Sequence, residues 1–265
     1  MMDTNLTSIR EELVSVVHGA GKLVEKFLAK GFTSHSKGGV DFATEADDAT
    51  DVFLRDELSR RFPQTTFLTE ETAPKEYASY VEKDNLWVID AIDGTTNFSR
   101  GSSHFAISVG LVDKGKTKLG VVFLPLENKL YWAQSDMEKS YLNDAPIHVS
   151  RTSSLQKALL CCDWSWDIEK RKKTLGIFAN ILPNVRAIQS RGSAASEITS
   201  VASGNLDAYF AYGLKPWDVG ASLLIAEKAG ATIRTLQLDD QWSVFSSDLL
   251  VTNGKIDGEM PPYFS

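Results

Sequence analysis

Near the start of the chain, apolar positions follow the spacing of a helix. Between residues 6 and 28, apolar side chains recur at steps of three and four residues, which places them on one face of a helix. The pattern predicts an amphipathic helix of roughly six turns, ended by Gly31. A second helix is predicted after Thr44, because Thr44 as N-cap and Asp47 at the third helical position match a capping box.

Residues 87–98 combine an apolar strand with a polar end: Trp-Val-Ile-Asp-Ala-Ile-Asp-Gly-Thr-Thr-Asn-Phe. The apolar first part predicts a buried strand that ends at Asp90. Asp93 follows, Gly94 lets the backbone turn, and Thr95 begins a run of residues that cap helices. Carboxylates suit Mg²⁺, and a helix N-terminus suits phosphate. The stretch is typical of a metal-dependent phosphate enzyme, although Asp-x-x-Asp-Gly alone is more often an ordinary acidic turn.

Other acids occupy similar positions. A strand predicted over residues 65–69 ends on Glu70-Glu71, and Asp218 lies at the start of a helix predicted to run to Ala229. Taken singly, Glu70-Glu71 is equally well a charged loop, and Asp218 is an acid that complements the helix dipole. With Asp90 and Asp93, however, they place carboxylates at strand-to-helix junctions, where open sheets hold their ligands.

The rest of the pattern alternates strands with helices. Residues 105–133 predict an antiparallel meander. Further strands are predicted over residues 158–162, 185–188, 206–212, 232–236 and 249–252. A helix is predicted over residues 167–182, and a loop of small residues at 190–195 leads into another helix that ends at Ala202. The alternation indicates an α/β (α+β) chain. We expect a single domain over residues 1–265, with the metal and phosphate site in an N-terminal half (residues 1–145) and a C-terminal half (residues 146–265) that completes it.

A polar, flexible loop is predicted over residues 34–40. Its Lys37 could approach a phosphate, but a loop lysine is more often simply solvated. None of the four histidines lies in a motif, so we expect them to be structural or surface residues.

Composition narrows the class of protein. The net charge of −7 over 265 residues argues against a nucleic-acid-binding surface. No apolar run approaches the ~20 residues of a membrane span, and the N-terminal residues do not resemble a signal peptide. Cys161 and Cys162 are adjacent within a predicted strand, which favours a reducing cytosol over a disulfide or a zinc site. We therefore expect a cytoplasmic protein that does not bind membranes.

Together these blocks resemble the inositol monophosphatase family, the lithium-sensitive, Mg²⁺-dependent phosphatases. The family pattern is an early Asp, then Glu-Glu, then Asp-Pro-Ile-Asp-Gly-Thr, then Trp-Asp with a later Gly-Gly. The matching blocks here are Asp47, Glu70-Glu71, residues 90–95, Trp217-Asp218 and residues 229–231. The resemblance covers essentially the whole chain. It implies a layered α-β-α-β-α sandwich and, commonly, a homodimer.

The resemblance also implies roles for individual residues. Two or three Mg²⁺ ions would be held by Glu70, Asp90, the main-chain oxygen of Ile92, Asp93 and Asp218. Glu70 and Thr95 would activate the attacking water, with Asp47 holding Thr95. The substrate, a small-molecule phosphate ester, would contact Asp93, Gly94, Thr95, Ser193, Ala194 and Asp218.

Three positions depart from the family pattern. Ala91 replaces the usual proline, Ala231 replaces the second glycine, and Ala211 stands where inositol-specific members carry a glutamate that holds sugar hydroxyls. Ala211 removes one contact that would select inositol, whereas catalysis should survive its loss. We therefore expect the substrate to be inositol 1-phosphate or a related sugar or polyol phosphate, a class that Thr96-Asn97 supports by resemblance. Histidinol phosphate, fructose 1,6-bisphosphate, a 3′-phosphoadenosine nucleotide, or a regulatory role with little turnover remain alternatives. A Ca²⁺-binding module is disfavoured because the chain has no EF-hand loop.

Overall fold

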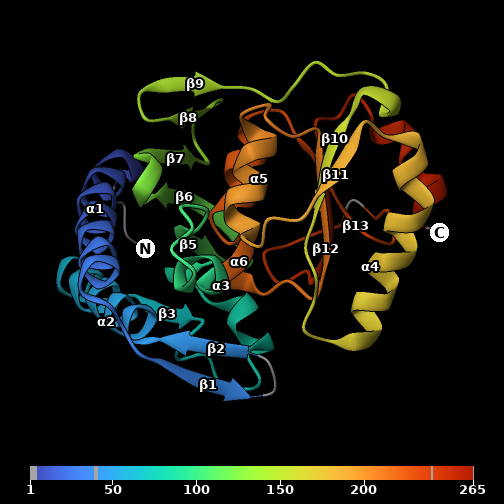
Figure 1. Cartoon of the computed structure of the whole chain (residues 1–265). Helices are drawn as coiled ribbons and strands as arrows, with labels where there is room; N and C mark the ends of the chain where they lie inside the picture. The colour runs from blue at the N-terminus through green and yellow to red at the C-terminus, as the bar shows by residue number, and fades with distance from the viewer. Residues whose placement is uncertain (1–4, 39–40, 240, 265) are drawn as a thin grey trace.

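The computed structural model describes residues 5–38, 41–239 and 241–264. Figure 1 shows five layers: two helices, a first sheet, a middle layer of helices, a second sheet and an outer helix. This arrangement confirms the α-β-α-β-α sandwich. Among the described helices, none has the combined length and apolar character needed to cross a membrane.

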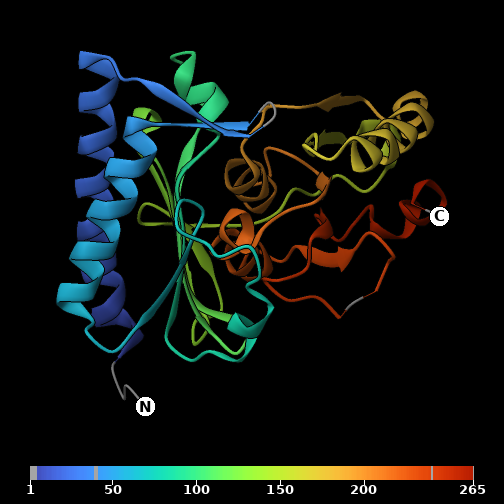
Figure 2. The same cartoon turned by 90° about the horizontal axis from the view of Figure 1, so that it is seen from below.

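The first sheet is covered on its outer face by the two predicted N-terminal helices, α1 (Leu6–Lys30) and α2 (Glu45–Arg61), which lie side by side in Figure 2. Its strands run in the order β3 (Thr66–Thr69), β4 (Leu86–Asp93), β5 (Ala106–Asp113), β6 (Lys116–Leu124), β7 (Lys129–Gln134), β8 (Ser140–Leu142) and β9 (Ala145–Ile147). Strand β3 is parallel to β4, and the others pair antiparallel. The predicted meander is therefore confirmed.

The segment after α1 differs from its prediction. Residues expected to form a flexible loop instead form an antiparallel hairpin of β1 (Ser34–Gly38) and β2 (Asp41–Thr44). Gly39 and Val40 of that predicted loop lie outside the described residues. Strand β1 is exposed throughout and polar, so it carries no alternation of apolar and polar residues from which a strand could be predicted.

The second sheet has the order β11 (Ala187–Gln189), β10 (Leu159–Cys162), β12 (Ala208–Tyr212), β14 (Asp248–Thr252) and β13 (Thr232–Thr235). Helix α4 (Ile168–Ile181) packs on its outer side, and α5 (Ala194–Ala202) lies between the two sheets. The division between sheets falls near the boundary predicted at residues 145 and 146. That the two halves form a single domain stays a prediction.

The helix predicted to run to Ala229 is divided. Helix α6 (Pro216–Val219) and helix α7 (Ser222–Lys228) are separated by Gly220 and Ala221. The backbone of this break lies directly on the first sheet, over Gly110 of β5 and its cross-strand partner Gly120 of β6. A Cβ atom at Gly110 would lie 2.5 Å from the carbonyl oxygen of Gly220, and one at Gly120 would collide with the carbonyl of Ala221.

This close approach predicts the effect of one added methyl group. Gly120→Ala should destabilise the protein by about 1–3 kcal/mol, because the carbonyl of Ala221 must move away, and the displaced α6 should carry Asp218 with it. The free energy of unfolding in urea measures the first effect. Gly176→Ala is the matched control, since Gly176 lies in exposed α4 with no atom within 4 Å of the added Cβ. That change should stabilise the protein by up to about 1 kcal/mol. Equal stability of the two variants would contradict the packing argument.

Candidate metal and phosphate site

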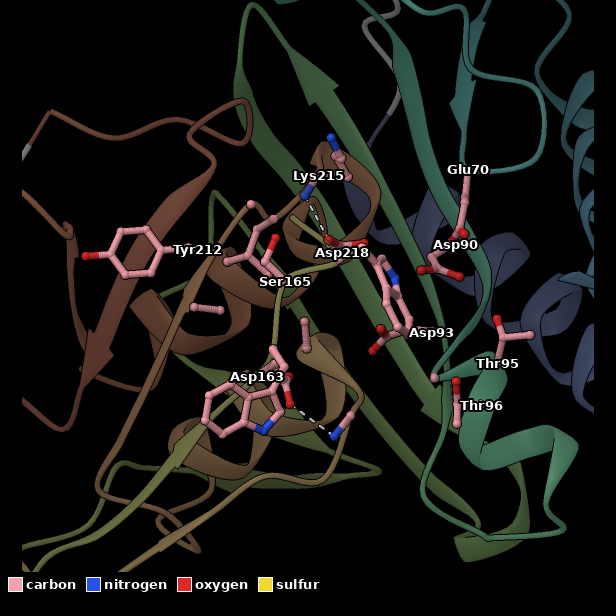
Figure 3. A pocket seen from close by; sticks show the side chains of 18 of the residues that line it. Glu70, Asp90, Asp93, Thr95, Thr96, Asp163, Ser165, Tyr212, Lys215 and Asp218 are labelled. Carbon is pink, nitrogen blue, oxygen red and sulfur yellow. Dashed lines mark hydrogen bonds between the residues drawn. The ribbon is translucent and has the colours of Figure 1, made fainter. Parts of the chain in front are cut away.

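A cavity of about 700 Å³ lies where the two halves of the chain meet. Glu70 enters it directly after β3, Asp90 and Asp93 enter from β4, and Thr95 enters from α3 (Thr95–Ser99). Asp218 of α6 joins them from the C-terminal half. Figure 3 shows these side chains around one space. The structure thus brings together the acids that the sequence placed at strand ends.

Strand β4 does not end at Asp90 as predicted but continues to Asp93. Alternation along a regular strand would point Asp90 and Asp93 to opposite faces. Against β5, however, Asp90 pairs with Ser108 and Asp93 with Ala106, so β4 carries one extra residue between the two acids. This β-bulge brings both carboxyl groups into the same cavity.

Gly94 is required where the strand turns into α3. Its φ is +100°, and a Cβ atom there would lie 3.1 Å from the carbonyl oxygen of Gly192 and 3.3 Å from that of His104. Helix α3 has no side-chain cap at this end. Because the first N–H groups of a helix have no acceptor within it, these groups are available to an anion in the cavity.

The Asp47 carboxylate accepts hydrogen bonds from two residues, Thr44 and Thr95. Its Oδ2 accepts a hydrogen bond from the backbone N–H of Thr44 at 2.8 Å, which is half of the predicted capping box of α2. Its Oδ1 accepts from the hydroxyl of Thr95 at 2.9 Å. Burial raises the pKa of Asp47 above its ordinary value. The contact between Asp47 and Thr95, which only the resemblance implied, is therefore present.

Asp93 is held by the C-terminal half. Its Oδ2 accepts hydrogen bonds from the Ser193 hydroxyl at 2.5 Å and from the Ala195 N–H at 2.7 Å. Ser193 therefore contacts Asp93 and, unlike Ala194, does not line the cavity. The predicted contacts of Ser193 and Ala194 with substrate stay predictions.

Lys37 is more than the solvated loop residue that we expected. Its ammonium lies 2.8 Å from Glu70 Oε1 and 2.8 Å from Glu71 Oε1, so the β1–β2 hairpin closes over one edge of the acid cluster. Burial alone would lower the pKa of Lys37, but the two carboxylates outweigh it and raise that pKa. On the opposite side, the backbone N–H of Lys215 donates to Asp218 Oδ2 at 2.8 Å, as Figure 3 shows.

The cluster holds more negative charge than its protein neighbours neutralise. Within the described residues, Asp90, Asp93 and Asp218 form no salt bridge. Burial, together with repulsion from neighbouring acids, raises the pKa of Asp90 and of Asp218 well above the ordinary value. Burial likewise raises the pKa of Asp93 to about 7.

These oxygen donors fit a hard cation. All are carboxylates, which Mg²⁺ prefers, and Asp90, Asp93 and Asp218 each use only one carboxyl oxygen in the hydrogen bonds described. The side chains do not converge on a single point: within the described chain, no three Asp, Glu, His or Cys side chains form a ready set of ligands.

Asp163 is a site residue that the sequence analysis missed. It lines the cavity directly after β10, where its carboxylate accepts hydrogen bonds from the Tyr209 hydroxyl and the Gly192 N–H, both at 3.0 Å. Burial, and next the charge of Glu197, raises its pKa to about 6. An acid directly after a strand was the signal that singled out Glu70, and the same signal was available at Asp163.

Comparisons with known proteins identify relatives of the chain. Residues 5–261 match the model of the inositol monophosphatase family. The inositol-1-monophosphatase of Bacillus subtilis is 31% identical over 235 residues, covering 88% of each chain. The Nus factor SuhB of Escherichia coli (strain K12) is 31% identical over 223 residues, covering 83% of this chain and 82% of that protein.

A solved structure shares the fold. The inositol monophosphatase from Anabaena (Nostoc) sp. superposes with a TM-score of 0.85 at 27% identity, covering 98% of this chain and 96% of that one. The predicted resemblance is confirmed by a family match over nearly the whole chain. The protein belongs to the inositol monophosphatase family, a family of phosphatases that hydrolyse phosphoric monoesters.

Proposed function

We propose that this protein is a Mg²⁺-dependent phosphatase that hydrolyses inositol 1-phosphate or a related sugar or polyol phosphate. The observation that carries the proposal is the cavity itself, where Asp90, Asp93 and Asp218 lie without ion-pair partners among the described residues, beside the open start of α3. Such a site attracts a cation and then, beside it, an anion. The B. subtilis relative, named an inositol-1-monophosphatase, supports the inositol class of substrate.

Two or three Mg²⁺ ions would be held by Glu70, Asp90, the main-chain oxygen of Ile92, Asp93 and Asp218. When bound, Mg²⁺ lowers the pKa of a water molecule and neutralises charge on the transferred phosphoryl group. Lithium sensitivity, a family trait implied by the resemblance, belongs to this proposal as well.

The chain's own groups would position the attacking water. The Thr95 hydroxyl lies 2.9 Å from Asp47 Oδ1 and 3.2 Å from the Ile92 carbonyl oxygen, both of which accept its proton, so the lone pairs of the Thr95 oxygen are free to accept a hydrogen bond from water. Glu70 would take the proton that the water loses. Asp47 does not touch the reacting atoms and acts as a positioning residue that fixes the Thr95 rotamer.

The backbone would hold the phosphate. The N–H groups of Gly94 and Thr95 at the start of α3 face an anion without a competing side-chain cap. Ala194 and Ala211 also line the cavity and offer no polar side chain. Little covalent chemistry then falls to the protein, and positioning and charge stabilisation supply the rate.

A regulatory role is the second candidate, because the E. coli relative is named a Nus factor. The complete set of carboxylates favours turnover over a purely regulatory role. Histidinol phosphate, fructose 1,6-bisphosphate and 3′-phosphoadenosine nucleotides belong in the substrate panel as alternatives. A homodimer and a cytoplasmic location stay predictions.

Asp218→Asn should reduce turnover by orders of magnitude, because it removes charge from the cation site while the amide oxygen can still accept the hydrogen bond from Lys215 N–H. Phosphate release at saturating Mg²⁺ measures the effect. Asp136→Asn, at an exposed acid outside the cavity, is the control and should match the unmodified protein. Near-normal turnover of Asp218→Asn would exclude Asp218 from the mechanism.

Thr95→Ala should lower kcat by about 10²-fold and change KM much less, because the hydroxyl positions water rather than the ground-state phosphate. Steady-state kinetics separate the two parameters. Thr95→Ser retains the hydroxyl and should recover most of kcat. A raised KM with an unchanged kcat would show instead that Thr95 only binds substrate.

A further inference from the structure

One acid that lines the cavity has no role in the proposed mechanism. Most of the lining acids belong to the proposed cation site: Glu70, Asp90, Asp93 and Asp218. Asp167 caps α4 by accepting from the Glu169 N–H at 2.8 Å. Asp163 is the lining acid that remains, and it is partly buried. Removing a carboxylate from water is unfavourable unless it gains partners, so Asp163 is a candidate for contact with a ligand.

Asp163 lies at the end of the second sheet, on the face that borders the cavity. Strands β10 and β12 are parallel, with Cys162 opposite Phe210. One residue further along, this register places Asp163 beside Ala211, and alternation along a strand puts both on the face that carries Tyr209. Asp163, Tyr209 and Ala211 all line the cavity. Because the Ala211 side chain has no polar atom, Asp163 is the hydrogen-bonding member of this pair.

The Asp163 carboxylate is held in place but is not saturated with hydrogen bonds. Its Oδ2 accepts from the Tyr209 hydroxyl and its Oδ1 from the Gly192 N–H, both at 3.0 Å. Each oxygen of a carboxylate has two lone pairs, so each can accept one more hydrogen bond. A side chain that is already fixed loses little entropy when a ligand binds. Asp163 is therefore preorganised to accept from donor groups in the cavity.

The position of Asp163 relative to the phosphate site indicates which donors these are. Gly192, which donates to Asp163, precedes Ser193, whose hydroxyl donates to Asp93 at 2.5 Å. Figure 3 shows Asp163 facing the same space as Asp93, with Thr95 beyond. A phosphate bound at the start of α3 leaves the alcohol portion of its ester to fill the rest of the cavity, which Asp163 lines. Hydroxyl groups on that alcohol are donors, and their hydrogen bonds to a carboxylate are strong.

We propose that Asp163 selects polyol phosphates by accepting hydrogen bonds from hydroxyl groups on the alcohol portion of the ester. The inference rests on the proposed phosphatase function and deepens it, because it assigns recognition of the alcohol to a residue outside the cation site. Every phosphomonoester carries the same phosphate, so binding of that group does not distinguish one ester from another. A contact with hydroxyl groups does, because an ester that lacks them leaves the carboxylate without its partner.

The test uses two pairs of esters that differ only in their hydroxyl groups: inositol 1-phosphate with cyclohexyl phosphate, and glycerol 2-phosphate with isopropyl phosphate. Phosphate release with Mg²⁺ gives kcat/KM for each ester. The unmodified protein should favour the hydroxylated member of at least one pair. Asp163→Asn should lower that preference by about tenfold, the scale of a hydrogen bond to a charged group, because the amide has a single acceptor oxygen and no charge.

The asparagine variant can keep both present contacts of Asp163. Its amide oxygen can accept from the Gly192 N–H, and its amide N–H can donate to the Tyr209 oxygen, so the fold should be retained. Asp167→Asn is the matched control. It removes the same charge from the wall of the cavity, and asparagine still caps a helix, so the preference should not change. A purely structural role for Asp163 would lower kcat/KM for both members of a pair alike.

Two results would overturn the inference while leaving the phosphatase function intact. One is equal kcat/KM for the two members of each pair in the unmodified protein. The other is an unchanged preference in Asp163→Asn; if that variant also required more Mg²⁺, Asp163 would belong to the cation site instead.

Binding tests the same inference without turnover. If no ester is hydrolysed, the phosphatase function fails, and calorimetric titration in the presence of Mg²⁺ still examines Asp163. Tighter binding of inositol 1-phosphate than of cyclohexyl phosphate, lost in Asp163→Asn, would support the inference. Equal binding of the two esters, or a preference that persists in the variant, would overturn it.

Discussion

Repulsion among buried carboxylates is the interaction that the other groups of the site must offset. Asp90 is 2% exposed and Asp93 is 7% exposed, and ionised groups so placed are unfavourable unless they are paired. The surrounding groups offset this only in part: the Ile92 N–H, the Ser193 hydroxyl and the Lys215 N–H each donate one hydrogen bond. The protein thus folds around buried negative charge that these hydrogen bonds do not fully neutralise.

The cluster exists only because the two halves of the chain meet closely. Asp93, from the first half, is bound by Ser193 and Ala195 from the second. Asn97 of α3 likewise donates to the carbonyl oxygen of Arg191 at 2.6 Å. Glycines at the sheet surface let the α6–α7 break approach without obstruction, and that approach sets the position of Asp218. Packing between the two halves of the chain and chemistry in the cavity therefore depend on the same contacts.

The sequence predicted those features that depend on local spacing. The period of apolar residues located α1, and the capping box located α2; acids after strands located Glu70 and Asp90. Other features depend on partners distant in the chain. The break between α6 and α7 packs against glycines on strands about a hundred positions earlier. The bulge that turns Asp93 into the cavity is set by pairing with β5, and the β1–β2 hairpin lacks an apolar pattern altogether.

The central claim is that the buried carboxylates form a charge excess that a cation relieves, and the melting temperature of Asp90→Asn tests it most directly. The amide oxygen can still accept from the Ile92 N–H, while the repulsion with neighbouring acids is removed. In EDTA the variant should melt at a higher temperature than the unmodified protein. Added Mg²⁺ should raise the melting temperature of the unmodified protein strongly and that of the variant much less. A variant that is less stable in EDTA, or an unmodified protein whose melting temperature does not respond to Mg²⁺, would contradict the account.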